Sequence, residues 1–254
     1  MCRFCLALTR RDFCSGALAL GLGPPRSGLL EPALHVAPNQ IAVTLDACPG
    51  HFDPRIATTL VARRIPATIF VTAIWMHQNR QGLAYFLAHP DIFALENHGA
   101  KHLPPVLGTT QVYGLPVAGS LDAIKTEILN GAAAIHTATG KYPAWYRGAA
   151  GLYSPQAIPF IQSLGFKIAG YSLNSDQGAS LPAATVAARI TAARPGDVIE
   201  GHINQPHRPS GAGIATGLAA LQTQGTEFVL LPQGDVVPLD PLPRAEGPLD
   251  PTRL

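Results

Sequence analysis

The sequence predicts an α/β fold, a distorted (β/α)7-type barrel in which parallel strands are surrounded by outer helices. Short apolar runs alternate with amphipathic segments about seven times, which is the pattern of β-α units in series. The 254 residues suffice for one domain of barrel size. Polar residues follow several of the runs, and barrel sites form at the carboxyl ends of strands. An open parallel sheet is the alternative, and the number of units favours the barrel.

Residues 1–39 are predicted to be a twin-arginine-like signal followed by a linker. Arg10 and Arg11 precede the apolar stretch 15–23, and this order is typical of an export signal. We therefore expect an exported protein, periplasmic or extracellular, although a cytoplasmic extension is the alternative. The apolar stretch is about half as long as a membrane span, so no stable membrane anchor is expected.

The composition argues against several other partners and frameworks. Charged residues make up 13% of the chain and the net charge is +2, so we expect no surface for nucleic acid. Three of the four cysteines, Cys2, Cys5 and Cys14, lie in the predicted signal. Cys48 alone remains, so no disulfide framework is expected.

The body of the protein, residues 40–232, begins with two strands rich in apolar and β-branched residues. A helix with one apolar face lies between them. A second helix ends before Pro90, and the strand after it leads into a pair of histidines. A long helix then begins at Ser120, a residue type that caps helix N-termini. In chain order the strands are residues 40–45, 67–72 and 92–95, and the helices are residues 54–64, 83–87 and 120–139.

The second half of the body continues the alternation with shorter strands. Residues 103–119, between the histidine pair and the long helix, are expected to form a long loop. The proline-rich residues 233–254, after the last strand, are expected to form a tail outside the fold. The strands here are residues 144–146, 166–171, 198–201 and 228–231, and the helices are residues 155–164, 183–193 and 213–222.

Two histidines, His98 and His102, follow the third strand. Because they are four residues apart, they can converge on one point if the chain makes a helical turn there. Neutral imidazoles are good ligands for zinc and related metals. Each polar residue at a strand end has an ordinary structural explanation, but together they favour a hydrolytic site. Besides the two histidines, the polar residues at strand ends are Asp46, Arg147, Asn174, Asp176, Glu200 and His202.

Five segments resemble the motifs of the polysaccharide deacetylase family in order and spacing. They are Thr44-Leu45-Asp46-Ala47, His98-x-x-x-His102, Arg147-Gly148-Ala149-Ala150-Gly151, Asn174-x-Asp176 and Ile199-Glu200-Gly201-His202. The resemblance covers about residues 40–232. It implies a distorted (β/α) barrel that removes acetyl groups from chitin, peptidoglycan, xylan or a related glycan. It also implies a divalent metal cofactor, zinc first, with cobalt or nickel as alternatives.

The same resemblance implies a role for each matching residue. Asp46 matches the general base that takes a proton from the attacking water, and His202 matches the general acid that protonates the leaving group. Such a pair needs unlike pKa values, and a metal activates the water and polarises the acetyl carbonyl. The remaining matches are His98 and His102 as metal ligands, Arg147 as the residue that orients the base, Asp176 as the residue that holds His202, and Asn174, Tyr171 and Gly148 as substrate contacts.

The first motif departs from the family pattern at Ala47, where the family has a second aspartate that binds the metal. Three alternatives follow. Asp46 itself is the third ligand, which we favour and which leaves the role of the base to another group. Cys48 is a soft ligand, although Pro49 restricts the turn. Otherwise no metal is bound. The segment Leu-Asp-Ala-Cys resembles a divergent branch of the family.

The pocket loops differ from the family as well. Gly178 stands where the fourth motif has a tryptophan, and Ala149 or Ala150 replaces a proline, so the wall around the acetyl group is altered. His207 is a further candidate ligand at the rim, with a solvated side chain as the alternative.

Three functions compete on these observations. The leading hypothesis is an exported metal-dependent hydrolase that removes acetyl groups from an N-acetylated glycan of the peptidoglycan or chitin type. The second is a glycan-binding protein without catalysis, in which the metal site has decayed. The third is a hydrolase of another linear or cyclic amide.

Overall fold

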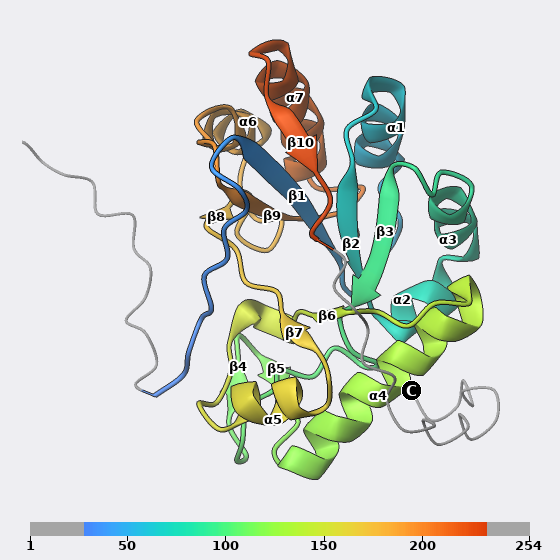
Figure 1. Cartoon of the computed structure of the whole chain (residues 1–254), viewed down its shortest axis with the longest axis vertical. Coiled ribbons are helices and arrows are strands. Elements are labelled where there is room, and N and C mark those ends of the chain that lie inside the picture. The colour runs from blue at the N-terminus through green and yellow to red at the C-terminus, as the bar shows by residue number, and fades with distance from the viewer. Residues whose placement is uncertain (1–27, 233–254) are drawn as a thin grey trace, which may run out of the picture.

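The central sheet of the protein is parallel and curved, and it runs in the order β7-β6-β3-β2-β1-β9-β8. The structure is a computed structural model and describes residues 28–232, so the predicted export signal and the C-terminal tail lie outside the described residues. Figure 1 shows the strands enclosed by helices. The strands are β1 (Gln40–Ala47), β2 (Ala67–Val71), β3 (Phe93–Asn97), β6 (Trp145–Tyr146), β7 (Lys167–Ile168), β8 (Leu173–Asn174), β9 (Val198–His202) and β10 (Glu227–Val229).

Two irregularities distort the barrel. Strands β7 and β8 follow each other in the chain but stand at opposite ends of the strand order, so the sheet does not close between them. Strand β10 pairs with the first residues of β1, and β2 pairs with the later ones, beginning at Val43. The predicted distorted (β/α)7-type barrel is therefore confirmed, as a parallel half-barrel with outer helices.

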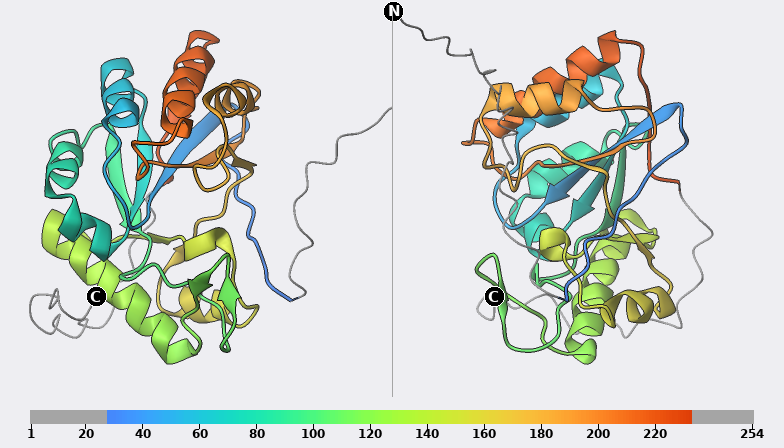
Figure 2. Two further views of the ribbon diagram at one scale, coloured as in Figure 1. Left: turned by 180° about the vertical axis from the view of Figure 1, so that it is seen from behind. Right: turned by 90° about the vertical axis from the view of Figure 1, so that its left-hand side faces the viewer.

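The helices cover the outside of the sheet (Figures 1 and 2). Helices α6 and α7 lie side by side beyond β9 and β10, and the long α4 crosses the opposite end of the molecule. Side chains cap several of them: Asp53 caps α1, Thr72 caps α2 and Ser120 caps α4. The helices are α1 (Pro54–Arg63), α2 (Ala73–Gln78), α3 (Arg80–Leu87), α4 (Leu121–Thr139), α5 (Ala157–Ser163), α6 (Ala183–Thr191) and α7 (Ser210–Thr223).

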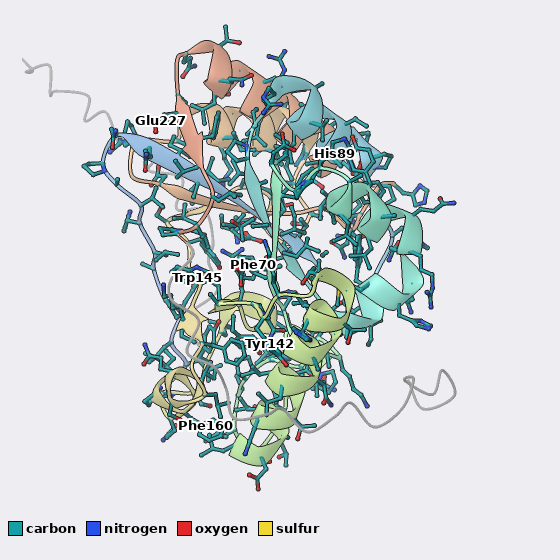
Figure 3. The ribbon with its side chains drawn as sticks, turned by 45° about the vertical axis from the view of Figure 1, so that its right-hand side comes forward. Phe70, His89, Tyr142, Trp145, Phe160 and Glu227 are labelled. Carbon is teal, nitrogen blue, oxygen red and sulfur yellow. The ribbon has the colours of Figure 1, made fainter. Side chains whose placement is uncertain are left out.

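Alternation along β1 sorts its side chains between two faces. Val43, Leu45 and Ala47 belong to the large apolar cluster that packs under the helices. Ala42 belongs to a separate cluster with Phe70, which lies near the centre of the molecule in Figure 3. The inner face of β1 thus runs from an apolar floor to the polar residues at its carboxyl end.

Some short elements differ from the prediction. The predicted loop 103–119 contains a two-stranded hairpin, β4 (Gln111–Val112) and β5 (Leu115–Pro116). Strand β8 and helix α2 were not predicted either. Elements this short contain too few residues to show a hydrophobic period. Within residues 28–232, no helix combines the length and the hydropathy that a membrane crossing requires.

Candidate active site

Arg147 holds the carboxylate of Asp46 at the end of β1. The arginine follows β6 and is 1% exposed. Its Nη1 donates to Asp46 Oδ1 at 2.9 Å, and its Nη2 donates to Thr44 Oγ1 at 2.9 Å and to the Gly170 carbonyl at 3.0 Å. The guanidinium also lies 4.3 Å from the centre of the Phe70 ring. These contacts fix the orientation of Asp46 and leave its Oδ2 facing the neighbouring strand ends.

His202 ends β9 directly beside Asp46, its partner in the register of β1 and β9. Its Nδ1 lies 2.9 Å from Asp176 Oδ1, and its backbone N–H donates to Asp176 Oδ2 at 2.8 Å. Because an ionised carboxylate only accepts, Nδ1 carries the proton and Nε2 points away from Asp176. The side chain of His202 is 17% exposed, so a ligand can reach it.

The two groups have opposite protonation tendencies. Burial alone would raise the pKa of Asp46, but cationic neighbours, Arg147 first, outweigh it and lower that pKa. Burial alone would lower the pKa of His202, but the carboxyl groups of Asp176 and Glu200 raise that pKa well above its ordinary value. An ionised Asp46 can take a proton and a protonated His202 can give one, which are the roles of a base and an acid.

His98 and His102 lie on a loop after β3, and their ring centres are 4.9 Å apart. The helical turn that we expected between the two histidines is not formed. The loop is irregular there, and His102 has a φ of 66°. Glu127 of α4 stabilises the loop: its Oε1 accepts from Lys101 N at 2.8 Å and from Leu103 N at 3.2 Å. His98 is fixed separately, because its Nδ1 lies 2.8 Å from the Arg147 carbonyl and its Nε2 is left to face the site.

These residues fit a divalent metal. Among the described residues, His102 Nε2 is buried without a hydrogen-bond partner. One ligand atom each of Cys48, His98 and His102 lies within 4.8 Å of the others. Asp46 Oδ2 is also near, 3.7 Å from His98 Nε2. Burial lowers the pKa of His98, but the charges of Asp46 and Cys48 outweigh it and raise that pKa to about 9.

Glu200, one of the polar strand-end residues noted in the sequence, is a second acid beside His202. Its Oε1 lies 3.2 Å from His202 Nδ1, and its Oε2 is buried without a hydrogen-bond partner in the part of the chain that the structure describes. Burial, aided by Asp176 and Asp46, raises the pKa of Glu200 to about 8. The two-residue spacing of Glu200 and His202 puts both on one face of β9.

Glu127 was not singled out from the sequence, although its position carries a signal. Ile124, Ile128 and Gly131 are buried on one face of α4, and Glu127 lies on that same face. An acid on the apolar face of a helix needs a buried partner. Here the partners are the backbone N–H groups of the histidine loop.

The three expected substrate contacts have partners within the protein. Tyr171 donates from its hydroxyl to Glu31, in the segment that precedes β1. Asn174 Oδ1 accepts from the backbone of Gln177 at 2.8 Å, and Gly148 N donates to a tyrosine hydroxyl at 2.6 Å. The structure therefore joins Asp46, His98, His102, Arg147, Asp176 and His202 in one site, and it gives Asn174, Tyr171 and Gly148 contacts that position the loops around it.

Two loop positions bear on the altered pocket. Gly178 is exposed, and a side chain there would meet no atom within 4 Å, so no wall is built from this position. His207 is exposed as well, and its ring lies 6.3 Å from that of His51.

Comparisons with known proteins identify the family of the chain. A family model described as polysaccharide deacetylase matches residues 35–169. No curated protein matches the sequence significantly. Several solved structures share the fold, including the following three. The peptidoglycan N-acetylglucosamine deacetylase Bc1960 is 21% identical over 79% of this chain and 90% of its own, with a TM-score of 0.65. A family 4 acetyl xylan esterase from Clostridium thermocellum, solved with a cobalt ion, is 22% identical over 75% and 87%, with a TM-score of 0.60.

The third similar structure is a CE4 family pseudoenzyme from Bacillus anthracis. It is 17% identical over 78% of this chain and 67% of its own, with a TM-score of 0.61. The family model covers more than half of the chain, and residues from the motifs of the sequence lie together in one place. The chain therefore belongs to the polysaccharide deacetylase family and is a deacetylase-like hydrolase acting on C–N bonds other than peptide bonds.

Proposed function

We propose that the protein is an exported, metal-dependent hydrolase that removes acetyl groups from an N-acetylated glycan of the peptidoglycan or chitin type. The observation that carries the proposal is the pairing of Asp46, held by Arg147, with His202, held by Asp176, on adjacent strand ends. The two imidazoles of His98 and His102 lie beside this pair. Export rests on the twin-arginine-like segment of the sequence alone.

In this mechanism Asp46 Oδ2 accepts a proton from the water that attacks the acetyl carbonyl. Arg147 keeps the carboxylate ionised and oriented, because its positive charge is held in a hydrogen bond to Asp46. His202 then gives the proton of its Nε2 to the departing sugar amine, while Asp176 stabilises the charged ring. A bound divalent metal, which we expect to be zinc, with cobalt or nickel as alternatives, would lower the pKa of the water and polarise the carbonyl.

The test is acetate release from chitooligosaccharides and peptidoglycan fragments, with Zn²⁺, Co²⁺ or Ni²⁺ added after removal of bound metal. We expect wild-type protein to release acetate and His98→Ala to release none above background. His136→Ala is the matched control, because this histidine lies in the last turn of α4 and stacks on Tyr142. Equal rates for wild type and His98→Ala would exclude catalysis by this site.

A second candidate is a glycan-binding protein without catalysis. Ala47 occupies the position of a family metal ligand, and one of the similar structures is described as a pseudoenzyme. Glycan binding that is indifferent to a chelator, with no acetate release, would support this candidate. A panel of linear and cyclic amides run in the same assay would reveal the third alternative, hydrolysis of another amide.

A further inference from the structure

We propose that Cys48 is the third protein ligand of the metal, which makes the site a Cys-His-His centre. The inference rests on the proposed function only for the presence of a metal. Cys48 is buried, and its Sγ lies 3.4 Å from His98 Nε2. Zinc bonds of about 2.3 Å to sulfur and about 2.0 Å to nitrogen, at a tetrahedral angle, put the two ligand atoms about 3.5 Å apart. The observed separation of 3.4 Å therefore fits two ligands on one ion.

The alternation of β1 explains why the ligand moves by one residue. Ala47 is fully buried in the cluster under the helices, and its carbonyl accepts from Thr72. A carboxylate at this position would stand in an apolar layer unless the strand ended earlier. Cys48 is two residues beyond Asp46, so it returns to the side of the strand that bears the catalytic residues.

The same contacts separate Cys48 from Asp46 as candidates. Asp46 Oδ1 is engaged by Arg147, and its other oxygen is 3.7 Å from His98 Nε2. The close ligand group of Asp46 is a different one, with Glu200 and His202, whereas Cys48 groups with His98 and His102. Assigning the metal to Cys48 leaves Asp46 as the base, so the site keeps both functions that the family places on two aspartates.

A thiolate in the third position changes which metals the site prefers. Sulfur is a soft ligand that favours zinc over the harder Mg²⁺ and Mn²⁺, which prefer oxygen. The His102 Nε2 atom, buried and without another hydrogen-bond partner in the described residues, completes the set. Three protein ligands on a tetrahedral ion leave one position open for water or substrate.

The test is cobalt substitution of the full chain, followed by electronic spectroscopy and a metal titration. We expect wild-type protein with one Co²⁺ to show an intense near-ultraviolet thiolate-to-cobalt charge-transfer band, and Cys48→Ser to lose it. Loss of an outer-shell partner costs about 10- to 100-fold in metal affinity, so loss of this ligand should weaken binding about 100-fold or more. The variant with Cys2, Cys5 and Cys14 changed to serine must keep the band and the affinity.

Other outcomes would overturn the assignment. Cobalt bound with no thiolate band, and with equal affinity in Cys48→Ser, would exclude Cys48 as a ligand. A band that disappears with the three N-terminal cysteines would place the metal elsewhere. A wild-type protein that binds no cobalt would refute the centre. The outcome is independent of activity, because a thiolate band without acetate release would support the centre while refuting the deacetylase.

Discussion

Asp46 and His202 lie side by side on the paired strands β1 and β9, yet their surroundings shift their pKa values in opposite directions. Arg147 lowers the pKa of Asp46, and Asp176 with Glu200 raises the pKa of His202. Each group is thereby set to the protonation state that its proposed role needs at neutral pH. The family motifs of the sequence predicted both residues, because their chemistry is carried by residue type and spacing.

Glu200 offers a prediction about stability and pH. Its pKa is raised from 4.5 to about 8 in the folded protein, so the fold binds its proton more tightly than the unfolded chain does. The contribution of this proton to the free energy of unfolding is complete below about pH 4.5 and is lost as the pH rises toward about 8. Glu200→Gln, which stays neutral, should therefore gain stability relative to wild type by up to about 1.4 kcal/mol per pH unit.

Urea unfolding of Glu200→Gln and wild type at pH 5 and pH 8 measures this difference. The two proteins should differ more at pH 8 than at pH 5, in favour of the variant. A difference that shrinks as the pH rises would show that Glu200 is ionised and stabilising in the folded protein.

Among the elements, α4 and the histidine loop act as a unit. Glu127 reaches from the buried face of α4 to the loop backbone, and Gly131 on the same face leaves room for Gly99. We expect Glu127→Ala to lower metal affinity about 10- to 100-fold, because the loop that carries His102 loses its support. Glu127→Gln keeps an oxygen that can accept both N–H groups and should bind metal nearly as wild type does.

Metal titration by calorimetry distinguishes these two variants, with circular dichroism as the check on folding. Equal affinity for Glu127→Ala and wild type would mean that the loop holds its shape without α4.

The elements that the sequence predicted best are those with many residues in a regular pattern. The 19-residue α4, with Ser120 at its N-terminus, and the apolar β1 to β3 are in the predicted places. The loop 98–102 was misjudged, because spacing alone cannot distinguish a helical turn from a loop fixed by a distant carboxylate. Glu127 is 25 residues beyond His102, and such a contact leaves no local pattern.

At the scale of the whole molecule, the barrel makes one site from residues that are far apart in the chain. Asp46 and Arg147 are 101 residues apart, and their hydrogen bond is one of two buried side-chain links from Arg147 to β1. The order of β-α units predicted that strand ends would meet. It could not predict that β10 inserts beside β1 ahead of β2, since nothing in the run 228–231 specifies its neighbour.

A metal that joins the segments after β1 and β3 should stabilise the entire fold. A metal that binds only the native state adds about 2.7 kcal/mol to the free energy of unfolding when its concentration is 100 times the Kd. We expect Zn²⁺ to raise the Tm of wild-type protein and a chelator to reverse the rise, with neither changing the Tm of His98→Ala. Differential scanning calorimetry checks this, and an equal zinc-induced rise in His98→Ala would place the metal at another site.

The most direct measurement of the central claim is a double-mutant cycle on Asp46→Asn and His202→Ala, read as kcat/KM for acetate release. If both residues act on one acetyl group, each change alone should cost about 100- to 10,000-fold. The double variant should then cost far less than the product of the two, because residues that act as a unit are not additive. Near wild-type activity in either single variant, with its fold intact by circular dichroism, would contradict the account.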